Sequence, residues 1–197
     1  VLSASEAASV SVTSSVVDGS VSTNGTRGTV RITDNTFRQG SLQVSRPDGA
    51  AYTSSVVVTG NTLPQGLLSV SSLNTSAAAV PIVVTGNQVT DHVIEVKDAQ
   101  LRPTNLTGNT ITGTVEPTLR YGGTLVENWT LPLTGPHLYF TDFAVAPGTT
   151  LTVPAGAAME FAEEQGLTVK GSLVSQGTAA APAVFAAFDG GGLSEIQ

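Results

Sequence analysis

The chain has 197 residues, no cysteine and a formal net charge of −7. The absence of cysteine excludes a disulfide framework and any thiolate metal site. The balance of 8 Lys and Arg against 15 Asp and Glu argues against a nucleic-acid partner, because phosphate binding needs clustered basic side chains. With 12% charged residues, 21 glycines and abundant Ser, Thr and Val, the composition is typical of an all-β protein.

The same composition bears on location. Scarce lysine, abundant Ser and Thr, and overall acidity favour an extracellular or cell-surface protein over a cytosolic enzyme. No apolar run approaches the roughly 18 residues of a membrane-spanning helix, so membrane insertion is not expected. No signal peptide opens the chain, and Glu195-Ile196-Gln197 at its end carries no obvious stop signal, so we expect a segment of a longer protein.

The first residues predict a cap followed by one imperfect repeat. Residues 2–8 contain acceptable helix formers and predict a short helix that caps the end of the fold. Residues 10–17 alternate Val with Ser and Thr, which predicts a strand and a corner at Ser15. This segment matches the unit that recurs downstream, with Ser15 in the place of an asparagine.

A short polar motif then occurs four times. Its four copies are Thr33-Asp34-Asn35-Thr36-Phe37, Thr59-Gly60-Asn61-Thr62-Leu63, Thr85-Gly86-Asn87-Gln88-Val89 and Thr107-Gly108-Asn109-Thr110-Ile111. The asparagines are 26, 26 and 22 residues apart, a spacing typical of solenoids. In the first three copies the seventh and ninth residues after the asparagine are apolar, namely Leu42 and Val44, Leu68 and Val70, and Ile94 and Val96. Each unit therefore predicts a strand, an asparagine corner, a second strand with one buried face, and a variable connection.

The pattern changes near residue 120. Eight of the ten aromatic residues lie beyond that point, and short apolar runs at residues 151–153, 159–161, 167–169, 173–174 and 184–185 are separated by Gly and Pro. Corresponding positions recur after 22 residues, from Leu151 to Leu173, and after 24 residues, from Phe161 to Phe185. We therefore predict one β-helix section over residues 1–120 and a second over residues 121–197 that stacks on the first or continues it.

The repeat predicts a right-handed parallel β-helix. A coil of 22 to 26 residues cannot bury its apolar face alone, and stacked neighbours create the core. Coils about 4.8 Å apart would place Asn35, Asn61, Asn87 and Asn109 in a ladder in which each side-chain amide bonds to the next. The glycine before three of these asparagines suits a tight corner.

These residues also resemble a known family. The Thr-Gly-Asn-Thr phrase with its flanking Val or Ile, and the stretches LTVPAGAAMEF and GLTVKGSLVSQGTAAAPAVFAAF, are similar to the right-handed parallel β-helix repeats of bacterial secreted and surface proteins, the pectate-lyase-like superfamily. The resemblance covers roughly residues 9–188. It implies the fold, but that family includes polysaccharide lyases, hydrolases, adhesins and phage tailspikes, so it does not choose a function.

No catalytic constellation stands out. Glycan-cleaving enzymes need carboxylates close together, or a calcium cluster with a basic residue nearby. The acidic candidates are Asp34, Asp91, Asp98, Glu116, Glu160, Glu163 and Glu164. They form no column through the repeat, and the Asn-Thr-Asp and Gly-His-Gly motifs of the polygalacturonase-like members are missing. We expect no catalytic residue, no cofactor and no metal, with Glu160, Glu163 and Glu164 as the one weak calcium candidate. His92 and His137, far apart in sequence, are interpreted as rim residues.

Two surface features remain as candidates. A threonine column, Thr13, Thr33, Thr59, Thr85 and Thr107, lies next to inward-facing residues and should face solvent. A second row follows at Thr36, Thr62, Gln88 and Thr110. Evenly spaced threonines occur on ice-binding solenoids, although Thr is also an ordinary residue of an exposed strand. Tyr121 and Trp129 lie outside the predicted strands and are candidates for glycan contact, whereas Phe161 and Phe185 are predicted core residues.

The sequence thus favours a non-catalytic section of an extracellular or cell-surface β-helix protein, acting as an adhesin, a stalk or a self-assembling scaffold. Open strand edges at the ends of a β-helix predict homo-oligomers formed by end-to-end stacking. A carbohydrate-binding or polysaccharide-degrading module with a surface glycan as its ligand is the alternative, and an ice-binding surface is the second alternative.

Overall fold

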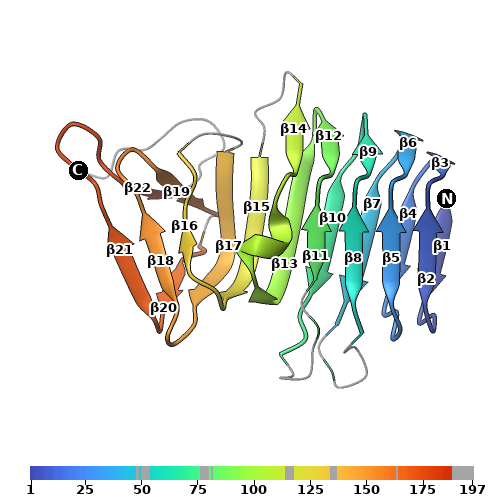
Figure 1. Cartoon of the computed structure of the whole chain (residues 1–197), viewed down its shortest axis with the longest axis horizontal. Helices are drawn as coiled ribbons and strands as arrows, with labels where there is room; N and C mark the ends of the chain where they lie inside the picture. Colours follow the sequence, from blue (N-terminus) through green and yellow to red (C-terminus); the bar gives the residue numbers. More distant parts are fainter. Residues whose placement is uncertain are drawn as a thin grey trace.

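The chain folds as an all-β parallel solenoid (Figure 1). The structure is a computed structural model, and it describes residues 1–47, 49, 54–75, 80, 82–113, 118–133, 137–162 and 164–187. The strands of residues 2–13 and those of residues 172–187 lie at opposite ends of the stack in Figure 1. The predicted fold class is therefore confirmed.

The largest sheet runs the whole length of the stack, with ten strands in the described residues. Its strands pair in the order β1 (Leu2–Ser5), β4 (Val21–Asn24), β7 (Leu42–Arg46), β10 (Leu68–Ser72), β13 (Val93–Leu101), β15 (Thr118–Leu125), β17 (His137–Val145), β19 (Ala158–Phe161) and β22 (Val184–Ala187), and β20 (Leu167–Val169) pairs with β17. Every pairing in this sheet is parallel. We call it the long sheet.

Three shorter sheets close the coils. The first contains β2 (Val10–Thr13), β5 (Val30–Thr33), β8 (Val56–Thr59) and β11 (Val83–Thr85). The second contains β3 (Val16–Asp18), β6 (Thr36–Gln39), β9 (Thr62–Leu63), β12 (Gln88–Thr90) and β14 (Thr110–Thr112). The third contains β16 (Trp129–Thr130), β18 (Thr150–Val153) and β21 (Ser172–Ser175). A single 3-10 turn, η1 (Pro103–Leu106), precedes the fourth asparagine corner in the described chain.

The core consists of apolar columns that follow the predicted register. Leu42, Leu68 and Ile94 stand in line on the long sheet, and all three are fully buried. Ile32 and Val58 form an equivalent column on the first short sheet. Each fully buried side chain of this kind contributes about 1.5–3 kcal/mol relative to an exposed one, and each needs a coil on both sides to be covered.

The asparagine ladder joins successive coils at one corner. The Nδ2 atoms of Asn35, Asn61 and Asn87 donate to the Oδ1 atom of the next asparagine at 2.9, 3.0 and 3.0 Å. The same Oδ1 atoms also accept the backbone N–H of the asparagine before, at 3.2, 3.0 and 3.1 Å. In the first coil the backbone N–H of Ser15 donates to Oδ1 of Asn35 at 3.0 Å, which confirms Ser15 as the ladder's degenerate end.

The corner requires a left-handed backbone just before each asparagine. Gly60, Gly86 and Gly108 have φ values of 67°, 65° and 72°, and Asp34 takes the same conformation at 58°. A residue with a Cβ is strained there, which explains why glycine precedes three of the four asparagines.

The start of the chain differs from the sequence-based expectation. The predicted cap helix over residues 2–8 is wrong, because β1 is a strand that pairs in parallel with β4. Its alternation of Leu2 and Ala4 with serines suits the open edge of the long sheet better than a helix. The division near residue 120 stays a prediction, although the long sheet passes through that point without interruption from β13 to β15 to β17.

Candidate functional site

The threonine column is not evenly exposed. Thr33 is only 2% exposed, Thr59 and Thr85 are half-buried, and Thr13 and Thr107 at the two ends are exposed. The expectation that all five face solvent is therefore wrong for Thr33. Its register neighbours are Thr13 and Thr59, and like side chains about 4.8 Å apart cover one another.

The second row is exposed throughout but lies elsewhere. Thr36, Thr62, Gln88 and Thr110 are all exposed and in register on the sheet of β3, β6, β9, β12 and β14. The first row belongs to the sheet of β2, β5, β8 and β11, except for Thr107 after η1. The asparagine corner separates the two sheets, so the two rows do not form one flat face.

The predicted glycan contact at Tyr121 is wrong. Tyr121 lies within β15, is 5% exposed and is aligned with Val96 and Phe140 at inward positions. Its ring meets Trp129 edge-on, with centroids 5.4 Å apart, and burial raises the pKa of its hydroxyl far above the ordinary value. Trp129, in β16, is half-buried and packs against the core. Both rings therefore pack with the core, as does Phe161, whose predicted core position is confirmed, whereas Phe185 is only partly buried against the core.

The carboxylates are spread over different environments. Glu160 is buried in β19, Glu164 is exposed, and Glu163 and Glu116 lie outside the described residues. Asp34 and Asp91 are exposed at left-handed turns, with φ of 58° and 52°. His92 is exposed, and His137 begins β17. Within the described ranges no three His, Asp or Glu side chains come together in a group able to hold a metal ion.

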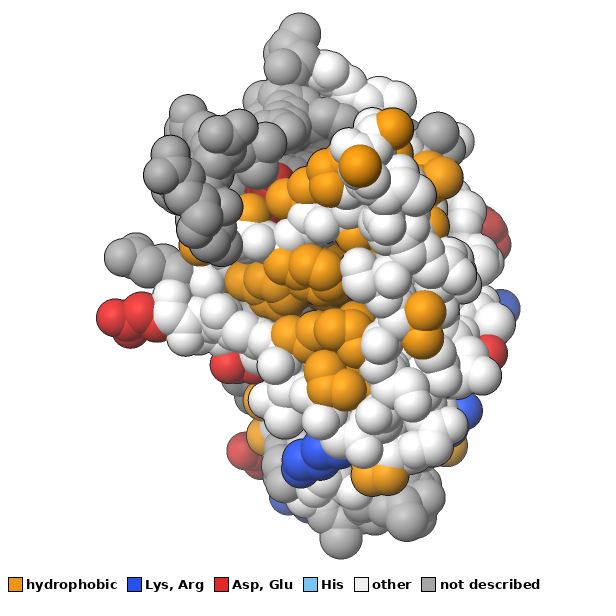
Figure 2. Space-filling view, turned by 90° about the vertical axis from the view of Figure 1, so that its left-hand side faces the viewer, with side chains coloured by type: hydrophobic (Ala, Val, Ile, Leu, Met, Phe, Trp, Pro, Cys, Tyr) orange, Lys and Arg blue, Asp and Glu red, His pale blue; other side chains and the backbone are white. Residues whose placement is uncertain are grey.

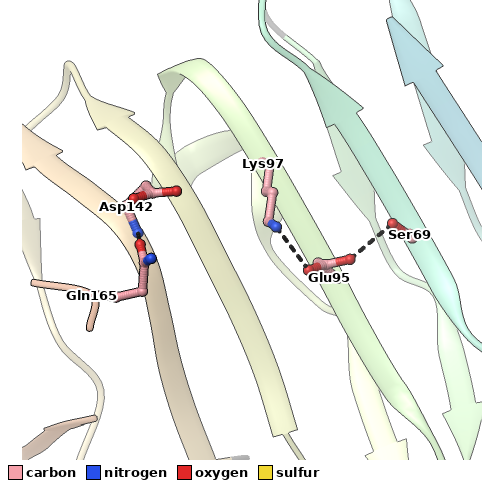
Figure 3. A network of polar contacts seen from close by, with 5 residues as sticks. All are labelled: Ser69, Glu95, Lys97, Asp142 and Gln165. Atoms are coloured by element: carbon pink, nitrogen blue, oxygen red, sulfur yellow. Dashed lines mark hydrogen bonds and ion pairs between the residues drawn. The ribbon is translucent and has the colours of Figure 1, made fainter. Parts of the chain in front are cut away.

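The outer face of the long sheet gathers charged and aromatic side chains in its middle. Figure 3 shows Lys97 and Ser69 pointing toward Glu95 from neighbouring positions of β13 and β10, at 3.3 and 3.1 Å. The guanidinium of Arg120 lies 5.4 Å from the ring centroid of Tyr139. Glu95, Arg120 and Tyr139 are consecutive in register. Farther along, the backbone N–H of Asp142 donates to the Gln165 side chain at 3.0 Å.

A buried polar column was missed by the sequence reasoning. Arg46, Ser72 and Asp98 are in register on the long sheet and point into the solenoid, and all three are buried. Each lies 11 residues after an asparagine of the ladder, so it continues the alternation of the apolar seventh and ninth positions. That extension of the period-2 pattern was the signal that could have found it. We call these residues the polar corner.

The polar corner fixes the connections that leave the stack. The guanidinium of Arg46 donates to the carbonyls of Ser54 and Ser55, just before β8, and of Gly28 in the preceding coil. Burial lowers the pKa of Arg46. All these acceptors are backbone carbonyls. The geometry therefore supports a structural role, in which Arg46 holds the connection before β8 against the connection of the preceding coil at Gly28.

Asp98 holds the next connection, the segment just before β11, in a similar way. Its carboxylate accepts the backbone N–H of Gln100 at 3.0 Å and that of Ile82, just before β11, at 3.4 Å. Burial raises the pKa of Asp98, and the two hydrogen bonds and the nearby Arg102 oppose that rise.

No protein-family model, no curated protein and no solved structure matches the chain. No helix in the part of the chain that the structure describes is long and apolar enough to cross a membrane.

Proposed function

We propose that this chain is a non-catalytic structural section of an extracellular or cell-surface β-helix protein, in which it serves as a stalk, an adhesin body or a scaffold. One observation carries the proposal: the corner asparagines of three successive coils are buried and bonded to the next coil. Asn35, Asn61 and Asn87 are at most 1% exposed, and their amides are occupied by ladder and backbone contacts. Groups so occupied cannot bind or transform a ligand.

The single-copy polar groups support the same proposal. Arg46 and Asp98 bind backbone groups of their own connections, and Asp34 and Asp91 occupy turns that need a left-handed residue. A structural role accounts for each of them without a substrate. The acidic composition, with scarce lysine and abundant Ser and Thr, is in keeping with an extracellular or surface location.

The test is incubation of the full chain with a panel of acidic and neutral polysaccharides, followed by detection of new reducing ends and unsaturated ends. We expect none above the blank. Cleavage that is lost in Asp91→Asn or Glu160→Gln, but kept in the control Asp18→Asn at an exposed position, would overturn the structural proposal.

The outer face of the long sheet favours a second candidate, a carbohydrate-binding surface. Arg120 and Tyr139 with Glu95 and Lys97 form a half-buried array of charged and aromatic groups on this outer face, which suits ring stacking and hydrogen bonding. Titration calorimetry with the same polysaccharides tests it. Binding that Arg120→Gln weakens and Arg31→Gln, on the exposed side of β5, leaves unchanged would support this role, whereas no heat from any polysaccharide would reject it.

A further inference from the structure

Three buried polar atoms in the first coils have no hydrogen-bond partner among the described residues. They are Nε of Arg46 and the hydroxyl oxygens of Thr23 and Thr26. The side chains of Arg46, Thr23 and Thr26 are 2%, 1% and 0% exposed. Because an unpaired buried polar group lowers stability, nearly all such groups in proteins pair with another protein group, a water molecule or an ion. Three of them in one part of the fold therefore indicate a bound partner.

The fold brings these atoms to one corner of the solenoid. β4, which contains the buried Thr23, pairs in parallel with β7. Just after β4, the backbone N–H of Gly25 donates to the β7 backbone at 3.0 Å. Arg46, at the end of β7, donates from its guanidinium to the carbonyl of Gly28. The Arg46 side chain therefore extends along the segment from Gly25 to Gly28, in which Thr26 lies buried.

The three atoms have matching chemistry. Nε of Arg46 can only donate a hydrogen bond, and each threonine hydroxyl can donate one. The other guanidinium nitrogens of Arg46 already donate to the backbone carbonyls of Gly28, Ser54 and Ser55. A shared acceptor is therefore the partner that this chemistry predicts.

The charge of Arg46 decides what kind of acceptor suits the corner. In the end-on view of Figure 2, the Lys, Arg, Asp and Glu side chains in view lie around the margin of the hydrophobic centre, whereas Arg46 is buried inside the stack. Its carbonyl partners are neutral, and no carboxylate of the described residues forms an ion pair with it. Asp98, in the same column, is two strands away, about 10 Å at the usual spacing between strands. A buried cation without a counter-ion is unfavourable, so an anion fits this corner better than a water molecule.

We propose that Thr23, Thr26 and Arg46 form a binding site for one small monovalent anion, with chloride as the ligand. The Nε–H group of Arg46 and the two threonine hydroxyls donate to it. One guanidinium balances one negative charge, which favours chloride over sulfate or phosphate. An anion site of this kind goes beyond the proposed structural function, and it would exist whether or not the chain is a scaffold. Because Arg46 also holds the connection before β8, the anion would strengthen the contact between successive coils.

The experiment is urea unfolding of the full chain, followed by circular dichroism, in mixtures of sodium chloride and sodium gluconate at constant ionic strength. Gluconate is too large for a site enclosed by buried side chains. A ligand that binds only the folded state, at one site, lowers the unfolding equilibrium constant about tenfold for each tenfold rise in its concentration above the dissociation constant. We expect this dependence on chloride. Constant ionic strength leaves the screening of the net charge of −7 unchanged.

A pair of matched variants locates the effect. Thr26→Val keeps the shape of the side chain and removes one donor. The chloride concentration needed for half of the effect should rise at least about tenfold, because a hydrogen bond to a charged group contributes that much or more. In gluconate alone, Thr26→Val should be at least as stable as the wild type, since the hydroxyl that it removes has no partner there. Thr29→Val, at an exposed position of the same connection, should keep the wild-type dependence on chloride.

Three results would overturn the proposal. One is a wild type whose unfolding does not respond to chloride. Another is a Thr26→Val variant that keeps the wild-type dependence, because the anion would then bind elsewhere. The third is a Thr26→Val variant that loses the same stability in chloride and in gluconate, because the hydroxyl would then act without an anion. Circular dichroism establishes that the variants are folded, and Thr23→Val replaces Thr26→Val if the latter is not.

A crystal grown with bromide in place of chloride locates the ligand directly. Bromide is a close chemical analogue of chloride, and its anomalous X-ray scattering identifies it. A bromine peak within hydrogen-bonding distance of Nε of Arg46 is the expected result. A water molecule at that position, with no bromine signal, would contradict the anion site.

Discussion

Asn61→Ala probes the ladder at its most buried point. Asn61 is fully buried. Its Nδ2 atom donates to Oδ1 of Asn87 at 3.0 Å and to the carbonyl of Ile32 at 2.9 Å. Its Oδ1 atom accepts the Nδ2 and backbone N–H groups of Asn35 at 2.9 and 3.2 Å. Alanine removes all of these contacts at once.

The expected loss follows from the groups left without a partner. The Asn87 oxygen still accepts the backbone N–H of residue 61, and the Asn35 amide still donates to the carbonyl of Val12. The carbonyl of Ile32 and the backbone N–H of Asn35 lose these buried partners. At about 1–3 kcal/mol for each orphaned buried group, the free energy of unfolding should fall by about 2–6 kcal/mol, a large part of the 5–15 kcal/mol typical of a domain.

Urea unfolding followed by circular dichroism measures this loss. Asn109→Ala, at the half-buried end of the ladder, should lose only about 1–2 kcal/mol, because water can reach the groups it exposes. Gln88→Ala, which follows the ladder residue Asn87 in sequence but is exposed, should stay within about 0.5 kcal/mol of the wild type. A loss below about 1 kcal/mol for Asn61→Ala, or equal losses at Asn61 and Asn109, would refute the reasoning.

Three further predictions concern single positions. Burial raises the folded-state pKa of Asp98, so the contribution of Asp98 to stability falls as pH rises through that pKa. The stability lost on Asp98→Asn, measured by urea titration, should therefore shrink from acidic to neutral pH. A loss that grows over that range would contradict the buried carboxylate. Gly28→Ala should disrupt folding, because the new Cβ would lie 1.5 Å from the carbonyl oxygen of Ala8. Gly166→Ala has open space around it and should leave stability nearly unchanged. Equal melting temperatures for the two variants would count against the packing of the first coils. Tyr121→Ala should lower the free energy of unfolding by about 3–5 kcal/mol, as expected of a buried aromatic side chain. A loss below about 1 kcal/mol would contradict the buried position of Tyr121.

The repeat explains what the sequence could predict. Asn35, Asn61, Asn87 and Asn109 recur at a fixed place in every unit, and a feature needed on each coil reveals itself by repetition. The apolar columns followed from the same comparison, because Leu42, Leu68 and Ile94 hold one position relative to the corner. Four copies of one local pattern were enough to set the register.

Features that occur once were harder to predict. Tyr121 lies in β15 beside Gly122 and Gly123, where the register shifts. Because glycine is uncommon within strands, these two residues weakened the strand pattern around Tyr121. Arg46 is a charged residue at an inward position, and its buried state depends on carbonyls that the fold brings to it from both neighbouring coils. Thr33 is covered only because similar residues stack on either side of it. For Arg46 and Thr33 the deciding contact comes from another coil.

The measurement that tests the central claim most directly is the stability of the chain with residues 60–85 deleted. This deletion removes one 26-residue coil, joins Thr59 to Gly86, and places Asn87 next to Asn35 and Asp98 next to Arg46 in register. If each coil is a structural unit and none houses a single essential site, the shortened chain should fold, keep its β-sheet circular dichroism and unfold cooperatively. Deletion of residues 60–72, which breaks the register, should not fold. An unfolded 60–85 deletion, or a folded 60–72 deletion, would contradict the account.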